Sequence, residues 1–160
     1  MFTVASCGIL GEEGRSFGTV GTASLDPATK SAVTITGKPS AELQERYRLT
    51  IPTGAADSSY GYHREGGGGG ELWVSFKIDG EGLGAFLSSL GVSEEDLSPG
   101  FVAFTSSDLD LTGWSIDDSH SVKGKMIGTK NDDLKAPGAR VTIDYSDPGA
   151  VTVYALSVKP

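Results

Sequence analysis

The stretch LWVSFKI, residues 72–78, constrains the fold more than any other part of the chain. Its apolar residues alternate with Trp73, Ser75 and Lys77, and this period of two predicts a β-strand with one face against a core. The inward residues are Leu72, Val74, Phe76 and Ile78. Before it runs a series of five glycines, Gly66 to Gly70, where we expect a hairpin loop because polyglycine has high conformational entropy.

Other segments offer partners for this strand. The alternation of Ser58 to Arg64 predicts a half-exposed strand, and further strands are expected at 47–51, 141–145 and 151–158. The last is continuously apolar over residues 153–156, so we expect it at the centre of the sheet, covered on both sides. Between the final two strands, Asp147 to Ala150 has Pro second and Gly third, which fits a type II turn.

The helical signals are fewer. Apolar residues at i, i+3, i+4 and i+7 predict one helix packed on the sheet, namely Leu83, Phe86, Leu87 and Leu90. A short helical turn is expected at 41–46, and Ser93 with the acids after it predicts a brief second helix. The sequence therefore predicts an α+β fold, a mainly antiparallel sheet of about five strands with one packed helix and a long acidic loop.

Length and charge limit the possibilities further. With 160 residues the chain suits one domain with a core. Thirteen basic residues against 21 acidic ones give a net charge of -8, which argues against a nucleic-acid partner. A single cysteine excludes an internal disulfide framework and a thiolate zinc cluster.

The first third of the chain has two interpretations. Residues 19–25 and 32–36 flank Asp26 to Thr29 as a hairpin would, with the second strand at an edge of the main sheet. The alternative is a flexible leash, since the region is rich in Gly, Ser and Thr. We expect a signal remnant and tether at 1–14, the hairpin or leash at 15–44 and a single α+β domain at 45–160.

Val4-Ala5-Ser6-Cys7 resembles the lipobox of bacterial lipoproteins. The resemblance implies that Cys7 is lipidated and anchors the protein to the extracellular face of the cell membrane. Only six residues precede Cys7, too few for an export signal, so we expect the true start to lie upstream and the chain as written to be soluble. The alternative is an ordinary N-terminus with a free or buried cysteine.

A fainter resemblance covers residues 45–158. The segments ERYRLTIPTGAADSSYGY, LWVSFKI, LGAFLSSLG, a lone GW and RVTIDYSDPGAVTVYAL together resemble small uncharacterised surface lipoproteins of Gram-positive bacteria. This resemblance implies a location and a domain extent, and it implies no site.

The segment from Phe101 to Ala139 has few regular signals, and long loops of this kind are often functional. Residues 91–120 hold seven carboxylates and no Lys or Arg. We predict a recognition loop whose acidic face meets a basic or polyhydroxylated partner, anchored by Trp114. Its candidate binding residues are Asp108, Asp110, Trp114, Asp117, Asp118 and His120. The alternative is a solvated, irregular excursion.

Other chemistries have weaker support. Asp108-Leu109-Asp110 with Asp117-Asp118 could bind Ca²⁺, although the glycine and closing glutamate of an EF-hand are missing, and no other cofactor is expected. Catalytic motifs such as Gly-x-Ser-x-Gly or His-Glu-x-x-His are absent from the sequence. A small hydrolase using His120 and a loop carboxylate is the alternative function, and it requires His120 inside a pocket.

The leading hypothesis is therefore a non-enzymatic, lipid-anchored domain of the cell envelope that binds another surface protein or a glycan. A lipoprotein carried by a phage or mobile element is a further alternative that fits the same residues.

Overall fold

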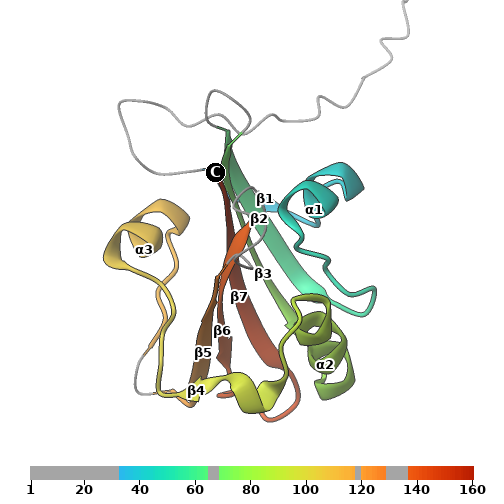
Figure 1. Cartoon of the computed structure of the whole chain (residues 1–160). Helices are drawn as coiled ribbons and strands as arrows, with labels where there is room; N and C mark the ends of the chain where they lie inside the picture. The colour runs from blue at the N-terminus through green and yellow to red at the C-terminus, as the bar shows by residue number, and fades with distance from the viewer. Residues whose placement is uncertain (1–32, 65–68, 118–119, 129–136) are drawn as a thin grey trace, which may run out of the picture.

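The computed structural model describes residues 33–64, 69–117, 120–128 and 137–160. In this part of the chain seven antiparallel strands form one sheet in the order β1-β2-β3-β7-β6-β5-β4. The strands are β1 (Ile35–Thr36), β2 (Ala56–Arg64), β3 (Gly70–Ile78), β4 (Ser98–Pro99), β5 (Val122–Ile127), β6 (Gly138–Asp144) and β7 (Val151–Lys159). Helices α1 (Ala41–Tyr47) and α2 (Gly80–Ser89) cover one face, and α3 (Ser106–Thr112) lies on the other (Figure 1). The α+β prediction is confirmed, whereas about five strands and one helix were too few.

The centre of the sheet is the β3–β7 pair. These strands are in register over their whole length, from Gly70 opposite Lys159 to Ile78 opposite Val151. The predicted strand at 72–78 is thus confirmed, and so is the central position of the last strand, which has three strands on either side. The alternating side chains of β3 divide between two apolar layers, one on each face of the sheet.

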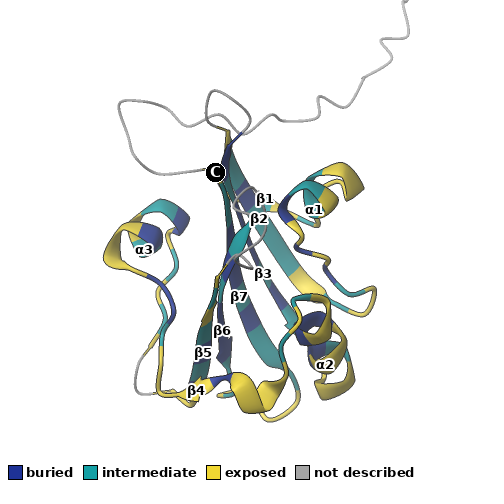
Figure 2. Ribbon diagram, viewed as in Figure 1, coloured by how far each residue is buried: buried dark blue, intermediate teal, exposed yellow. Residues whose placement is uncertain are grey.

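The main core lies between the sheet and helices α1 and α2 (Figure 2). It contains fifteen buried residues, among them Leu72, Val74, Phe76 and Ile78 of β3. Helix α2 begins where the Asp79 side chain accepts a hydrogen bond from the Gly82 N–H, and its Phe86 ring packs edge-on to Phe76 with the centroids 5.2 Å apart. The two predicted helices at 41–46 and 83–90 are both present.

The strand expected at residues 47–51 does not form. Tyr47 ends α1, and Arg48 takes a left-handed conformation with φ 52°. The Leu49 N–H then bonds to the Gln44 carbonyl, and the Ile51 N–H bonds to the Gln44 side chain at 2.8 Å. Leu49 and Ile51 are buried as a strand face would be, but their backbone groups bond to the end of α1 and not to a neighbouring strand.

The long acidic loop is also more regular than expected. Helix α3 begins at a capping box between Thr105 and Asp108, and β5 pairs with β6 from Val122 to Ile127. The predicted brief helix after Ser93 is a 3-10 helix, η2 (Glu94–Asp96). The turn after Asp147 is not type II, because Gly149 does not have the positive φ that this type requires. Instead, the Asp147 carboxylate accepts a hydrogen bond from the Gly149 N–H.

At the other edge of the sheet, β1 pairs with β2 through Ile35 and Thr36. These are the last two residues of the predicted strand at 32–36. Cys7, the lipobox-like residues and the predicted strand at 19–25 lie outside the described residues. Within the described part of the chain, none of the helices has the length and apolar character needed to span a membrane.

Candidate functional site

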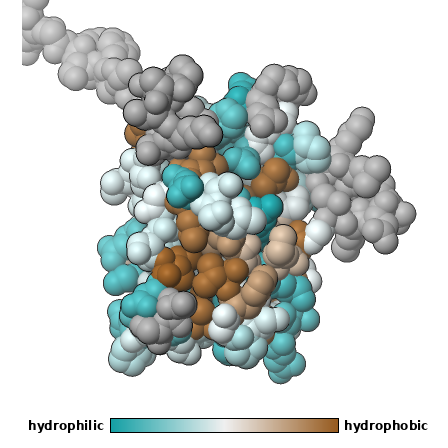
Figure 3. Space-filling view, turned by 90° about the vertical axis from the view of Figure 1, so that its left-hand side faces the viewer, coloured by the Kyte–Doolittle hydropathy of each residue, from teal (hydrophilic) through white to brown (hydrophobic). Residues whose placement is uncertain are grey.

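The face of the sheet that carries α3 is covered less completely than the other. Among the described residues, its apolar layer has three buried members, Trp73, Phe104 and Leu156. Seven more apolar residues in it are half-buried: Val102, Leu109, Leu111, Trp114, Ile116, Tyr154 and Val158. Figure 3 shows apolar side chains gathered at the centre of this side of the molecule. An apolar layer that stays partly open to solvent is a feature of binding surfaces.

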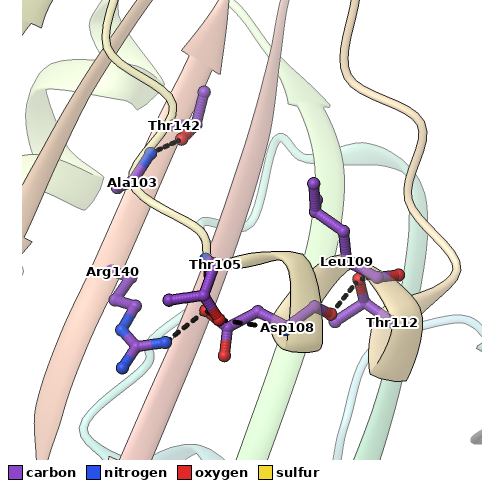
Figure 4. Close-up of polar contacts among 7 residues, drawn as sticks. All are labelled: Ala103, Thr105, Asp108, Leu109, Thr112, Arg140 and Thr142. Atoms are coloured by element: carbon purple, nitrogen blue, oxygen red, sulfur yellow. Dashed lines mark hydrogen bonds and ion pairs between the residues drawn. The ribbon is translucent and has the colours of Figure 1, made fainter.

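Helix α3 is attached to this face by Asp108, which is only 6% exposed. Its carboxylate accepts hydrogen bonds from the Thr105 N–H and hydroxyl at 2.7 and 2.8 Å and pairs with Arg140 of β6 (Figure 4). Nearby, the Ala103 N–H donates to the buried Thr142 hydroxyl at 3.0 Å. The carboxylate of Asp108 is therefore engaged in holding the helix.

Trp114 is positioned by the end of the same helix. Gly113 ends α3 in a left-handed conformation with φ 69°, which glycine adopts easily because it has no β-carbon. The chain thus turns, and the Trp114 ring packs edge-on against Phe104 and Tyr154, with centroids 5.1 and 5.2 Å away. Trp114 is half-buried in the α3 layer, with Tyr154 of β7 as its neighbour on the sheet.

His120 lies between two carboxylates. Its Nδ1 is 3.2 Å from Asp144 Oδ2, and its Nε2 is 3.6 Å from Asp117 Oδ2. Burial tends to raise the pKa of Asp144, but hydrogen bonds from Ser146 and the contact with His120 outweigh it and lower that pKa. Asp144 also acts on Tyr154, whose pKa is raised mainly by burial and further by this negative charge. Tyr154 is opposite Thr142 and Asp144 is opposite Thr152, so Asp144 lies diagonally across from Tyr154 on the same face of the sheet. We call Trp114, Tyr154, Asp144, His120 and Asp117 the Trp114–His120 site.

Of the six predicted site residues, Asp117 lies beside His120, and Trp114 packs against Tyr154 in the α3 layer. Asp108 is used in the attachment of α3, and Asp110 is exposed on that helix. Asp118 lies outside the described residues.

Sequence analysis missed Tyr154 and Asp144. The register places Ser75 opposite Tyr154 and Thr142 opposite Tyr154, so these residues share one side of the sheet. Asp144, two residues after Thr142, points to that side too. Polar residues at every second position of β6, namely Arg140, Thr142 and Asp144, were the available signal for Asp144.

Basic side chains lie against four of the described acidic residues of segment 91–120. Glu94 bonds to Lys123 at 3.0 Å and to the Tyr145 hydroxyl at 2.9 Å, and Asp96 lies 3.8 Å from Lys125. Asp108 forms an ion pair with Arg140, and Asp117 lies beside His120. Most of the described carboxylates of segment 91–120 therefore have a basic neighbour. Lys123 and Lys125 of β5 and Arg140 of β6 are remote in sequence from the η2 and α3 acids that they meet, whereas His120 is a local neighbour of Asp117.

The calcium and hydrolase interpretations receive no geometric support. In the ranges that the structure describes, His, Cys, Asp and Glu side chains form no group of three or more suited to a metal ion. The His120 side chain is 43% exposed, whereas the hydrolase hypothesis requires it inside a pocket.

Comparison of the chain with protein-family models, with curated proteins and with solved structures found no match.

Proposed function

We propose that this protein is a non-enzymatic, lipid-anchored domain of the bacterial cell envelope that binds another envelope component through the Trp114–His120 site. The anchor is inferred from Val4-Ala5-Ser6-Cys7, which resembles a lipobox. A single acyl chain anchors weakly, so a stable position at the membrane needs further acylation at the same cysteine.

One observation carries the binding part of the proposal. The Trp114–Tyr154 pair is half-buried on a sheet face that the described residues cover incompletely, and Asp144 of the Asp144–His120–Asp117 chain lies diagonally across from Tyr154 in the sheet. Trp and Tyr combine an apolar ring with a polar atom, and they are enriched where proteins bind ligands. The neighbouring imidazole and carboxylates add hydrogen-bond donors and acceptors to the ring surface.

Binding is tested with envelope fragments isolated from a Gram-positive bacterium. The full chain is mixed with the fragments, and the amount of protein that co-sediments with them is measured. The two histidines of the chain provide a matched pair. We expect His120→Ala to reduce co-sedimentation several-fold and His63→Ala, on β2, to leave it unchanged. Equal retention of both variants and the wild type would place the interface elsewhere.

The anchor is tested by mass spectrometry of the product of the complete gene in a bacterial host. We expect the mature chain to begin at an acylated Cys7 and the Cys7→Ser variant to stay unprocessed. An unmodified Cys7 in the wild type would overturn the anchor without affecting the binding proposal.

A further inference from the structure

We infer that the ligand of the Trp114–His120 site is a neutral, polyhydroxylated molecule, a glycan of the envelope that lies across the strands. This inference rests on the proposed function and deepens it. It is drawn from the side chains that the sheet places next to the site.

A row of hydroxyl groups leads across the sheet to the site. Thr36 of β1 is opposite Ser59 of β2, Ser59 is opposite Ser75 of β3, and Ser75 is opposite Tyr154 of β7. Residues directly opposite each other project from the same face, so the four hydroxyls share the face that carries Trp114. The row crosses four adjacent strands, a span of roughly 14 Å at the usual strand spacing.

The hydroxyls of this row can be reached from solvent. Thr36 is exposed, and Ser59, Ser75 and Tyr154 are half-buried. The Ser59 and Ser75 hydroxyl oxygens are 2.7 Å apart, which leaves each oxygen further hydrogen-bonding capacity. The Tyr154 hydroxyl makes no hydrogen bond to any residue in the described ranges. A hydroxyl both donates and accepts, as the hydroxyls of a sugar do, so the row matches a glycan in chemistry.

Around the row each basic group has two carboxylate neighbours, so these charges disfavour an anionic ligand. Lys77, next along β3 on the same face, is 3.9 Å from Asp57 and 3.9 Å from Asp147. Asp144 and Asp117 are both beside His120. A basic peptide would meet carboxylates that already have basic neighbours. The edge-packed rings of Trp114 and Tyr154 can instead contact the apolar C–H groups of a sugar ring.

The first experiment distinguishes a glycan from a protein ligand. Envelope fragments are treated either with periodate, which cleaves the vicinal diols of sugars, or with a protease, before co-sedimentation. We expect periodate to abolish binding and protease treatment to leave it intact. The opposite result would show a protein ligand and overturn this inference, while the proposed function would stand. Failure to bind untreated fragments would overturn the proposed function itself.

The second experiment tests the row of hydroxyls. Soluble glycans released from the same fragments are titrated into wild-type protein and into Ser75→Ala and Tyr154→Phe, each of which removes one hydroxyl. We expect each variant to bind about three- to tenfold more weakly, the effect of one lost hydrogen bond. Ser107→Ala, an exposed serine on α3, is the control and should bind as the wild type does. Thermal unfolding of each variant confirms that the fold is kept, and unchanged affinity in both row variants would overturn the inference.

Discussion

At the scale of single residues, Trp73 packs closely on Gly61 on the α3 face of the sheet. Trp73 is 1% exposed, and its indole lies across Gly61 of β2, the residue opposite it in the sheet. A β-carbon built at Gly61 would stand 2.5 Å from the Cε2 and Cζ2 atoms of the indole. The Tyr60-Gly61-Tyr62 stretch therefore needs its glycine to make room for Trp73, twelve residues further along the chain.

We predict that Gly61→Ala lowers the free energy of unfolding by about 1–3 kcal/mol, because the indole must move within a packed layer. Gly84→Ala is the matched control. A β-carbon there meets nothing within 4 Å, and alanine favours the helix by up to about 1 kcal/mol. Urea unfolding measures both. A Gly61→Ala protein as stable as the wild type would contradict the described packing.

A second residue-scale prediction concerns Tyr145. Burial raises its pKa, and so do the hydrogen bond to Glu94 and the charge of that carboxylate. The folded protein therefore holds this proton more tightly than the unfolded chain does, whose tyrosines titrate near pH 10. Stability from this group is fully present below about pH 10 and is lost as the pH rises above that value.

We therefore expect the free energy of unfolding to fall as the pH rises above about 10, and to fall less steeply in Tyr145→Phe. Urea unfolding at a series of alkaline pH values measures the two slopes. Tyr47 and Tyr154, whose pKa values are also raised, contribute equally to both proteins. Identical slopes would mean that the Tyr145 phenol is not held as described.

At the scale of elements, α3 is a short helix whose stability depends on its contacts. Its first turn is closed by the Thr105–Asp108 capping box, and Arg140 joins the same carboxylate to β6. A helix of this length is marginal in water on its own, so the attachment decides whether it forms.

We predict that Asp108→Ala lowers the free energy of unfolding by about 2–4 kcal/mol, because it removes the cap and leaves the partly buried Arg140 without its carboxylate. Asp110→Ala removes an exposed acid from the same helix and should cost less than about 0.5 kcal/mol. Thermal unfolding compares the two variants. An equal loss in free energy of unfolding in both variants would show that the Asp108 carboxylate does not hold α3 to the sheet.

At the scale of the whole molecule, the two faces of the sheet differ in how many described residues are buried against them. Fifteen buried residues lie between the sheet and helices α1 and α2, whereas the α3 layer has three. Segments with few buried contacts open more easily than the core to which they are attached. The proposed ligand site therefore lies in the less stable layer of the domain.

We predict from this difference that α3 opens without global unfolding. In hydrogen-exchange mass spectrometry, amides of residues 106–112 should exchange well before those of β3 and β7. Protection of α3 equal to that of the central strands would show that the two layers unfold together.

The sequence by itself determined the elements whose signals are local. Alternation of apolar and polar residues from Leu72 to Ile78 identified β3. Apolar residues at i, i+3, i+4 and i+7 from Leu83 identified α2, and the apolar run that begins at Val153 identified the central strand β7. These signals depend only on which side of a strand or helix each residue occupies. The same signal misled at residues 47–51, where Leu49 and Ile51 are buried without strand pairing.

Only the tertiary structure decided which residues meet. Alternation assigns a side chain to a face, but strand order and register choose its neighbours. Asp144 therefore reaches His120, Arg140 reaches Asp108 and Tyr154 reaches Trp114 across separations that no local pattern encodes. For the same reason, a segment with seven carboxylates and no Lys or Arg gives no sign of the lysines of β5 that lie against Glu94 and Asp96.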